Sequence, residues 1–464
     1  MFDCSKEFKR FYNNHVKLPD QEKNILRDKR DKNIKRLKNG LEKYNNENNT
    51  SYKIAESRTQ GSMAMHTIVQ NDRKDYDIDV AIVFESDNLG SLGPLATRNM
   101  IADALKREMH QFSEEPEVKT GCVRVRYTTG YHIDFAIFKR SKYSEWQDEY
   151  NYEYAGDVWS ARDIKALDDW FIEEIKAKTD DLRKVVRLSK MFCKSRDTWG
   201  SLPSGLIQTI LCSENFDSIH SRIDEKFYHT LKSIQSRLEW NLQVNAPNNI
   251  DNARSITTRQ VDLDKMRRWK DKLSTQLEKL DILFESDCTY QDAISAWGEF
   301  FNHDYWSGLG KSTVKISESL ESRSYKDTEE FIDELYPVLE RYSVGIDCRV
   351  SQDGFREISL YKYLEKHLQG FSRFIPFNFK VKCKVGNTDC PSYDKVLWKV
   401  RNVGEVAESK DCIRGQIEER THEIIEPTSF RGIHYIECYL IKDEICVAIG
   451  RIDVPIGQRD ENKL

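Results

Sequence analysis

The sequence predicts an α+β protein in three parts: a mixed sheet with helical cover, a helical second lobe and a small β-rich domain. Residues 52–140 alternate short apolar strands with one helical stretch, and residues 160–345 repeat apolar side chains at helical spacing. Residues 373–457 consist of alternating strand-like runs separated by turns. Because 464 residues are too many for one typical core, several domains are expected.

The elements can be placed in order along the chain. Residues 1–50 are predicted to be helical, since Ile34, Leu37 and Leu41 recur at helical spacing. Strands are expected near 54–57, 78–84, 118–119, 122–127 and 133–138, with a helix at 95–112. Further helices are expected at 181–195, 203–212, 220–243, 263–285, 293–302 and 329–340, with a loop at 244–258. The last strands are expected at 377–385, 396–400, 434–440 and 445–450.

A change of composition near residues 343–354 separates the helical part from the β-rich part. The predicted domains are therefore residues 1–160, residues 161–345 and residues 371–464, with a linker at 346–370.

Composition and charge narrow the classes of function. The formal net charge of −5 argues against general binding to duplex DNA, which requires a basic face. The 11 cysteines form no Cys-x-x-Cys pair, as is typical of reduced thiols in the cytoplasm. No run of about 18 apolar residues is present, so we expect neither a membrane span nor a membrane partner, and a cytoplasmic location.

Two carboxylates lie two residues apart where a strand becomes fully apolar. Asp77 and Asp79 share one face of the predicted strand, because alternate strand residues point the same way. Such a pair repels itself unless a cation lies between its members, and Mg²⁺ prefers oxygen ligands. Asp75 has the same parity, so Asp75 and Asp77 are an alternative pair. Asp77 and Asp79 are preferred because the apolar run begins at Val80.

Two further motifs surround this pair. Gly61-Ser62 can form a turn whose N–H groups approach a phosphate closely. Asp134 lies in a second apolar strand, between Ile133 and Phe135. A Gly-Ser turn, an Asp-x-Asp pair and a third Asp are what phosphoryl transfer with two metal ions requires. An acidic strand edge that resists aggregation is the alternative, but it does not explain an Asp134 embedded among apolar residues.

A second candidate set comes from the helical part. Lys190 lies within one predicted helix, and Ser204 lies in the first turn of the next. An ammonium beside a helix N-terminus with a hydroxyl can bind an anion, although a surface lysine is the ordinary interpretation.

Basic residues near the acidic motifs have less specific interpretations. Arg124 and Arg126 share one face of the strand before Asp134 and either balance the acidic cluster or contact a nucleotide. His66 and His132 are expected to be structural rather than general bases.

At these residues the chain resembles the DNA polymerase β-like nucleotidyltransferase superfamily. It looks most like the cGAS/DncV-like nucleotidyltransferases (CD-NTases) of bacterial anti-phage (CBASS) defence. The resemblance covers about residues 5–345 and lies in Gly61-Ser62 with Thr67, in 76–80, in 132–135, and in 182–190 followed by 202–205. It implies a nucleotidyltransferase core with an N-terminal helix at 1–160 and an OAS-like helical lobe at 161–345.

The C-terminal part, residues 371–464, resembles the AGS-C domain, which is proposed to be a sensor. The similar pieces are 398–405, 413–416, Glu423 and 432–439, which can equally be residues of a β-core and its turns.

Two departures matter for the nucleotidyltransferase resemblance of residues 5–345. The loop from Ser62 to Asp77 is slightly longer than is usual in the superfamily, which keeps Asp75 in contention. The zinc insertion of animal cGAS is absent, so no DNA-sensing surface is implied.

The resemblance implies a reaction and its participants. Asp77, Asp79 and Asp134 would hold two Mg²⁺ or Mn²⁺ ions. Gly61, Ser62, Thr67, Lys190 and Ser204 would bind the phosphates of NTP substrates, ATP and/or GTP. The product would be a cyclic di- or trinucleotide read by a separate effector, with an activator possible at the C-terminal domain. The alternatives are a template-independent nucleotidyltransferase acting on RNA, tRNA or protein, and a non-catalytic nucleotide-sensing module, which the intact acidic triad opposes. The β-domain could also serve only for docking or oligomerisation.

Overall fold

The structure is a computed structural model that describes residues 1–71, 74–142, 149–247, 255–311, 329–352, 354, 356–368, 374–409 and 412–457. The chain forms two compact units, Met1–Thr313 and Val314–Leu464. The predicted α+β class is confirmed. The finer domain limits at residues 160, 345 and 370 stay predictions. No helix in the described residues is both long and apolar enough to cross a membrane.

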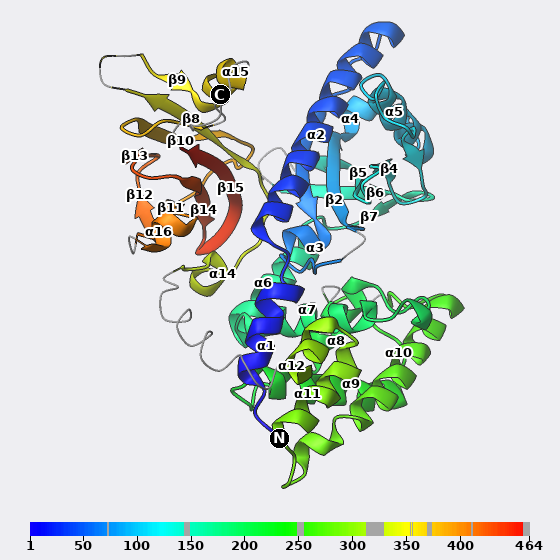
Figure 1. Cartoon of the computed structure of the whole chain (residues 1–464). Helices are drawn as coiled ribbons and strands as arrows, with labels where there is room; N and C mark the ends of the chain where they lie inside the picture. Colours follow the sequence, from blue (N-terminus) through cyan, green and yellow to red (C-terminus); the bar gives the residue numbers. More distant parts are fainter. Residues whose placement is uncertain are drawn as a thin grey trace. The chain divides into compact units, whose positions relative to one another are not determined.

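The first unit contains the mixed sheet that was predicted (Figure 1). Its strand order is β1 (Ile54–Gln60), β2 (Asp77–Glu85), β5 (His132–Lys142), β4 (Val123–Arg126) and β3 (Glu117–Val118). Two unexpected strands extend it, since β6 (Tyr150–Ala155) pairs with β5, and β7 (Trp159–Ala161) pairs with β6. β2 and β5 run parallel, and the other pairs are antiparallel.

The central strand β2 is apolar on both faces, so its acidic residues stand out. Ile78, Val80 and Ile82 pack into the core formed with α2 (Asp20–Asn48) and α5 (Pro94–Lys106). Ala81 and Val83 belong to a separate small cluster on the opposite face. Because strand residues alternate, Asp77 and Asp79 share this second face, away from α2 and α5. Short helices α3 (Gly61–Ala64) and α4 (Ser86–Leu89) follow β1 and β2.

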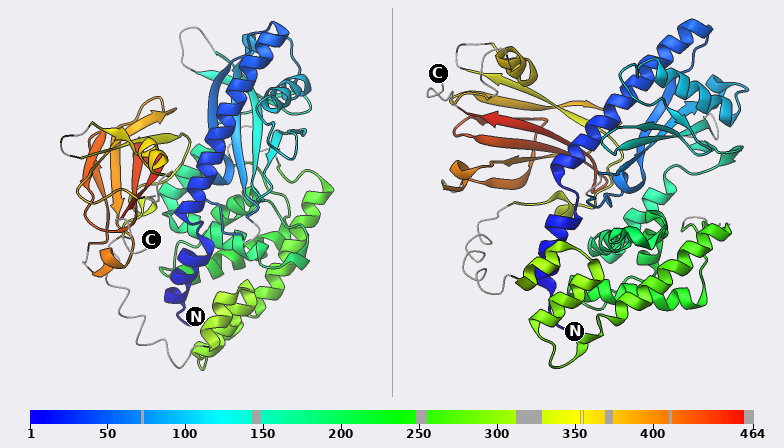
Figure 2. Two further views of the ribbon diagram at one scale, coloured as in Figure 1. Left: turned by 45° about the horizontal axis from the view of Figure 1, so that its top comes forward. Right: turned by 45° about the vertical axis from the view of Figure 1, so that its right-hand side comes forward.

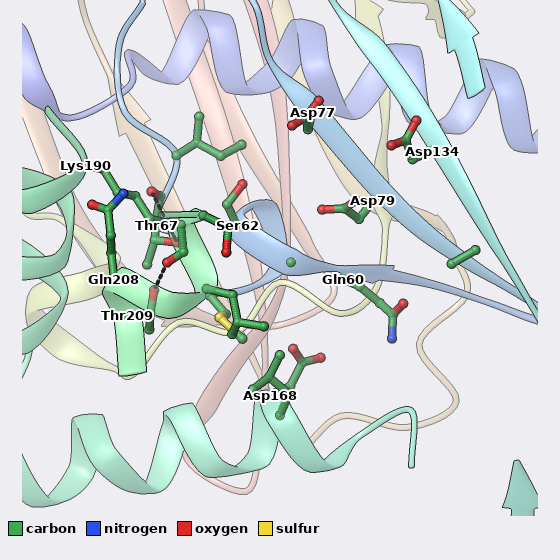
Figure 3. A pocket seen from close by; sticks show the side chains of 18 of the residues that line it. Gln60, Ser62, Thr67, Asp77, Asp79, Asp134, Asp168, Lys190, Gln208 and Thr209 are labelled. Atoms are coloured by element: carbon green, nitrogen blue, oxygen red, sulfur yellow. Dashed lines mark hydrogen bonds between the residues drawn. The ribbon is translucent and has the colours of Figure 1, made fainter. Parts of the chain in front are cut away.

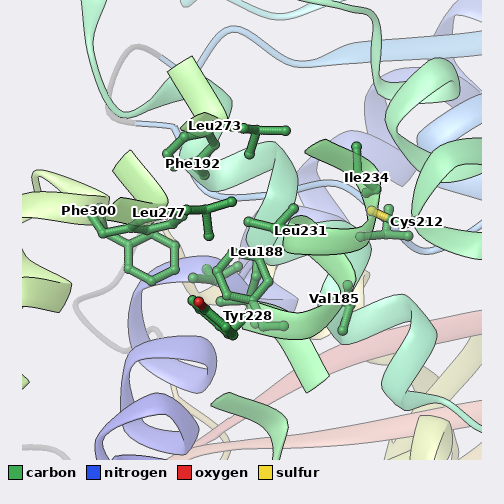
Figure 4. Packing of buried hydrophobic residues seen from close by; sticks show 14 of the residues in the cluster. Val185, Leu188, Phe192, Cys212, Tyr228, Leu231, Ile234, Leu273, Leu277 and Phe300 are labelled. Atoms are coloured by element: carbon green, nitrogen blue, oxygen red, sulfur yellow. The ribbon is translucent and has the colours of Figure 1, made fainter. Parts of the chain in front are cut away.

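The helical part of this unit has one aromatic-rich core (Figure 4). It is built from α6 (Ala166–Lys178), α7 (Asp181–Lys194), α8 (Gly205–Glu214), α9 (Ile223–Trp240), α10 (Gln260–Glu278), α11 (Tyr290–Phe301) and α12 (Asp304–Lys311). The short turns Asp197–Trp199 and Asp281–Phe284 are 3-10 helical. α1 (Ser5–Phe11) and the π-helical turn Tyr12–Val16 also pack here, since Phe8 and Phe11 contact Trp306 and Phe301. The predicted N-terminal helix is therefore divided before Pro19, and its first part joins the helical core.

The second unit contains two four-stranded antiparallel sheets, drawn as two layers in Figure 2. One sheet has the order β13 (Glu423–Pro427), β10 (Lys380–Thr388), β8 (Val344–Ser351), β9 (Ile358–Ser359). The other has the order β12 (Arg414–Arg420), β11 (Lys395–Arg401), β14 (Gly432–Lys442), β15 (Ile445–Ile456). Their inner faces share one hydrophobic core. Helices α14 (Ile332–Leu335), α15 (Leu360–Leu368) and α16 (Glu405–Ser409) complete the unit.

Several predicted elements differ from the structure. The stretch predicted as a linker at 346–370 contains most of β8, together with β9 and α15, and the helix expected at 329–340 is only the short α14. β12 and β13 were also not expected. These strands carry many charged side chains, which weakens the hydrophobic alternation that identifies a strand. Of the loop expected at 244–258, residues 248–254 lie outside the described residues, and Asn245 forms a bridge to Ser255.

Candidate functional site

The parallel pairing of β2 and β5 brings three acidic residues to one edge of the sheet. Asp79 lies directly opposite Asp134, and Asp77 lies opposite His132. On its other side Asp79 pairs with Gln60, the last residue of β1. All three carboxylates line a cavity of about 800 Å³ within the first unit. Figure 3 shows them on two neighbouring strands, with Lys190 and Gln208 across the cavity. The structure thus brings together residues that the sequence could only relate by spacing.

Asp79 is the electrostatic centre of this edge. Burial and the negative charges of Asp77 and Asp134 raise the pKa of Asp79 to about 7. A carboxylate whose charge is disfavoured by two neighbouring carboxylates would be stabilised by a bound cation. Three carboxylates are also the hard oxygen ligands that Mg²⁺ and Mn²⁺ prefer. The donor set therefore fits a divalent metal ion.

Two basic side chains, Arg124 and His132, pair with the carboxylates of Asp134 and Asp77. Arg124 donates to both oxygens of Asp134, with Nε–Oδ1 and Nη2–Oδ2 distances of 2.7 and 2.5 Å. His132 Nε2 binds Asp77 Oδ1, and this hydrogen bond raises the pKa of His132. Burial opposes the charge of Asp77 most strongly, but the hydrogen bond and charge of His132, together with the positive charges of Arg124 and Lys194, hold the pKa of Asp77 below its ordinary value. Among the described residues, no three His, Cys, Asp or Glu side chains form a ready-made metal site.

Asp75, the alternative metal ligand, and Arg126, whose role the sequence left open, lie in different parts of the site region. Asp75 precedes β2 and also lines the cavity, but its side chain is 66% exposed and lies 3.6 Å from His132 Nδ1. Arg126 instead pairs with Glu117, at 3.0 Å. Arg124 thus acts here as a charge-balancing residue, one of its two sequence-based interpretations.

Gly61 is required where β1 meets α3. Its φ is +66°, a region that residues with a Cβ rarely adopt. A Cβ added there would lie 2.2 Å from Asp79 Oδ2, so only glycine lets the turn pass the carboxylate. The chain then coils tightly, because the N–H groups of Met65 and Thr67 donate to the carbonyls of Gly61 and Ser62. The predicted Gly-Ser turn is thus a single helical turn packed against Asp79.

Three cations of α7 hold the segment after this turn. Arg183 Nε donates to Met65 O at 3.2 Å, and Arg187 donates to His66 O. Lys190 Nζ donates to Thr67 O at 3.1 Å and to Thr67 Oγ1 at 2.7 Å. The three cations are spaced 183, 187 and 190, which places them on one face of the helix. We call this set the α7 ladder: Arg183, Arg187 and Lys190 binding three successive carbonyls.

Arg183 and Arg187 were not predicted as functional residues. Both are almost fully buried, at 0% and 1% exposure. The available signal was three cations on one face of a helix that also carries many apolar residues, since buried arginine requires partners. The sequence pattern could not say that those partners are carbonyls more than 100 positions away.

Lys190 and Ser204 line the same cavity as the acidic residues. Burial, together with the positive charges of Lys194 and Arg187, lowers the pKa of Lys190 to about 7. Ser204 is the N-cap of α8, and its Oγ accepts from Ile207 N at 3.5 Å. Gly205 leaves room for Lys190, because an added Cβ would lie 3.0 Å from Lys190 Cε. The cavity also exposes polar residues that were not predicted: Gln60, Asp163, Asp168, Lys194, Gln208 and Thr209.

Comparison with known proteins agrees with this geometry. Residues 55–138 match the family model of the cyclic GMP-AMP synthase DncV-like nucleotidyltransferase domain. Residues 326–457 match the adenylyl/guanylyl and SMODS C-terminal sensor domain, AGS-C. A cyclic GMP-AMP synthase from Escherichia albertii is 23% identical over 411 residues, covering 85% of this chain and 83% of the relative.

Two solved structures are similar to part of this chain. Vibrio cholerae DncV cyclic AMP-GMP synthase, in complex with the linear intermediate 5′ pppA(3′,5′)pG, is 17% identical with a TM-score of 0.52. That match covers 65% of this chain and 97% of DncV. E. coli MS115-1 CdnC with ATP is 18% identical with a TM-score of 0.49, covering 65% of this chain and 98% of CdnC.

Proposed function

The chain is a nucleotidyltransferase of the cGAS/DncV-like family with a C-terminal AGS-C domain, and we propose that it joins NTPs into a cyclic di- or trinucleotide. The observation that carries the proposal is the meeting of Asp77, Asp79 and Asp134 with Gly61-Ser62 in one cavity. Lys190 and Ser204 line the same cavity. Carboxylates and phosphate-binding groups that line one cavity suit a triphosphate whose α-phosphate lies near the acids.

The proposed cofactors are two Mg²⁺ or Mn²⁺ ions bound by Asp77, Asp79 and Asp134. Bound divalent ions would supply charge neutralisation and a lowered pKa for the attacking hydroxyl. Asp79 supports this role most directly, since its carboxylate lies beside two others and its pKa is raised to about 7.

The chain's own residues orient the substrate. Gly61 places the α3 turn against Asp79, and the Ser62 side chain lines the cavity beside it. The α7 ladder keeps the following segment in place, so the groups that bind phosphate stay fixed relative to the carboxylates. In each transfer a ribose hydroxyl oxygen forms a bond to the α-phosphorus. The bond to the pyrophosphate oxygen breaks, and the hydroxyl proton is lost. The last transfer, the second for a dinucleotide and the third for a trinucleotide, closes the ring and releases the last pyrophosphate.

The wider role that we propose is signalling in anti-phage defence. The product would act on a separate effector in the cytoplasm, and a ligand of the AGS-C domain would regulate synthesis. Support for regulation comes from the sensor family to which residues 326–457 belong.

The test is incubation of the full chain with all four NTPs and Mg²⁺ or Mn²⁺, followed by phosphatase treatment and mass spectrometry. A phosphatase-resistant product of two or three nucleotides, absent with the D77A/D79A variant, is expected. D75A serves as the matched control, because Asp75 is the rival ligand. Linear transfer to added RNA, tRNA or protein, without a cyclic product, would favour the alternative nucleotidyltransferase function. Full activity of D77A/D79A would refute the assignment of the metal ligands.

A further inference from the structure

A second cavity, of about 620 Å³, lies within the C-terminal unit. Its walls come from both sheets: Val381 and Glu426 from one, and Arg414, Ile436 and Val454 from the other. The aliphatic side chains of Val381, Ile436 and Val454 are almost completely buried, at 2 to 3% exposure. A cavity of this size with an apolar floor is typical of small-molecule sites.

Two charged residues that line this cavity form an ion pair. Arg414 of β12 donates to both carboxylate oxygens of Glu426 on β13, at 2.6 and 3.2 Å. The two residues belong to different sheets, so the pair bridges the two layers. Arg414 is 43% exposed and Glu426 is 25% exposed, so water or a ligand can reach the pair. His434, which also lines the cavity, is held by the backbone, because its Nδ1 accepts from Val403 N and its Nε2 lies 3.0 Å from Phe430 O, and burial lowers its pKa.

The backbone holds Arg414 in an unusual conformation. Its φ is +58°, and that of Gly415 is +121°. Non-glycine residues at positive φ persist only where the surroundings hold them, and they are concentrated at ligand-binding sites. The surroundings here are specific: Arg401 Nη1 donates to Arg414 O at 2.9 Å, and Glu330 N donates to Gly415 O at 3.0 Å.

From these observations we infer that this cavity binds a small molecule with an apolar or aromatic body and an anionic head group, which Arg414 binds in place of Glu426. The planar guanidinium recognises carboxylate and phosphate with the same two-point geometry that it uses for Glu426. Replacing Glu426 with the ligand at Arg414 costs little free energy, because a partly exposed ion pair contributes little to stability. An anion is favoured over a cation because the anchored, strained residue is Arg414, whereas Glu426 lies in a regular strand.

The same strand offers a route from this site to the preceding chain. We call residues 329–342 the strap. Ile417 N of β12 donates to the Glu330 carboxylate at 2.7 Å, and Arg401 lies 3.5 Å from Glu329. Further along the strap, Leu339 and Tyr342 donate backbone hydrogen bonds to Cys446 and Val447 of β15. A ligand that moves Arg414 therefore acts on the residues that hold the strap. This part of the inference rests on the proposed regulatory role of the AGS-C domain, whereas the binding site itself does not.

The test is a fluorescence titration of the full chain, without NTPs or metal, with 1-anilinonaphthalene-8-sulfonate, which combines an aromatic body with one anionic group. R414Q should weaken binding about 10-fold or more, as expected for a charge-assisted two-point contact. E426Q should tighten it several-fold, because the competing carboxylate is removed. R420Q is the matched control, since Arg420 lies on the same strand and pairs with exposed Glu418, and it should leave binding unchanged.

Two further arms complete the design. Phenyl phosphate and 2-naphthoate, added as competitors, distinguish a phosphate from a carboxylate head group, and displacement by either supports the site. Circular dichroism of each variant shows whether it is folded. The inference is wrong if R414Q and E426Q shift binding in the same direction, if both match R420Q, or if neither competitor displaces the probe. Because no nucleotide turnover is measured, its failure is separate from failure of the proposed enzyme activity.

Discussion

The two cavities of this protein differ in how their charged side chains are arranged: like charges lie together in one, and opposite charges are paired in the other. In the first unit, Asp79 faces two other carboxylates and Lys190 is buried near two other cations. In the C-terminal unit, Arg414 and Glu426 neutralise each other above an apolar floor. The first arrangement leaves groups whose charge is disfavoured until a ligand arrives, as is common at catalytic sites. The second leaves a pair that one ligand can replace. Each prediction below tests one side of this contrast.

The largest effect on nucleotide turnover is expected from substitution of Asp77 or Asp79. D77A or D79A should lower nucleotide turnover by about 10³-fold or more, because both carboxylates are proposed to bind the metal ions. Product formation would be measured by mass spectrometry, and folding by circular dichroism. D75A should reduce turnover less than about threefold. A larger loss in D75A than in D79A would transfer the ligand role to Asp75.

Substitution of Gly61, the glycine beside Asp79, should have the next largest effect on turnover. G61A combines a strained φ with a Cβ only 2.2 Å from the Asp79 carboxylate. We expect turnover to fall by about 10²-fold, because displaced catalytic groups lose that much. Unfolding by urea should show a loss of about 1–3 kcal/mol. G90A is the matched control: Gly90 has φ +58° but nothing within 4 Å of the added Cβ. It should be destabilised by strain alone and stay active. Equal activity of the two variants would mean that the approach to Asp79 is unimportant.

The α7 ladder should have a smaller effect. R187M removes the donor to His66 O and should lower kcat/KM by about 10-fold, mainly through KM, because the phosphate-binding segment loses an anchor. K184M changes a cation of the same helix that pairs with Asp181 instead, and it should be nearly neutral. Initial rates over a range of ATP concentrations would decide. A uniform fall in kcat without a change in KM would show that the ladder does not position substrate.

Lys190 provides a pH test of the first cavity. Its pKa is lowered to about 7, so at pH 8.5 most Lys190 side chains are neutral. A bound triphosphate favours the charged form and raises this pKa, so ATP binding should take up a proton, approaching one per site. Calorimetry of ATP binding without divalent metal, in two buffers of different ionisation enthalpy, measures this uptake. K190M should abolish it. Uptake that is unchanged in K190M would assign the proton to another group.

The smallest effect is expected in the C-terminal unit. E426Q should change the free energy of unfolding by less than about 1 kcal/mol, because partly exposed ion pairs contribute little. Urea denaturation, monitored by fluorescence, would measure this. A loss of several kcal/mol would mean that the pair holds the two sheets together, and it would remove the contrast between the cavities.

The strands that carry Asp79 and Asp134 were easier to predict from the sequence than the strands of the C-terminal sheets. Around Asp79 and Asp134 the flanking residues are uniformly apolar, which identifies buried strands directly. β8, β12 and β13 instead carry charged residues in pairs such as Arg414–Glu426 and Lys384–Glu423. Such strands are stabilised by their neighbours rather than by their own pattern, so the linker expected at 346–370 contains most of β8, together with β9 and α15.

By itself, the sequence determined which chemical groups are present and which of them share a face. The spacing of Asp77 and Asp79 places both on one side of a strand, and positions 183, 187 and 190 share one side of a helix. These are local properties, set by the periodicity of the backbone. Only the tertiary structure decided which faces meet. It paired Asp79 with Asp134, and it joined α7 to carbonyls 118 to 123 positions earlier. It also placed Arg414 of one sheet against Glu426 of the other. Such partners depend on strand register and on packing between distant segments, which no short window of sequence contains.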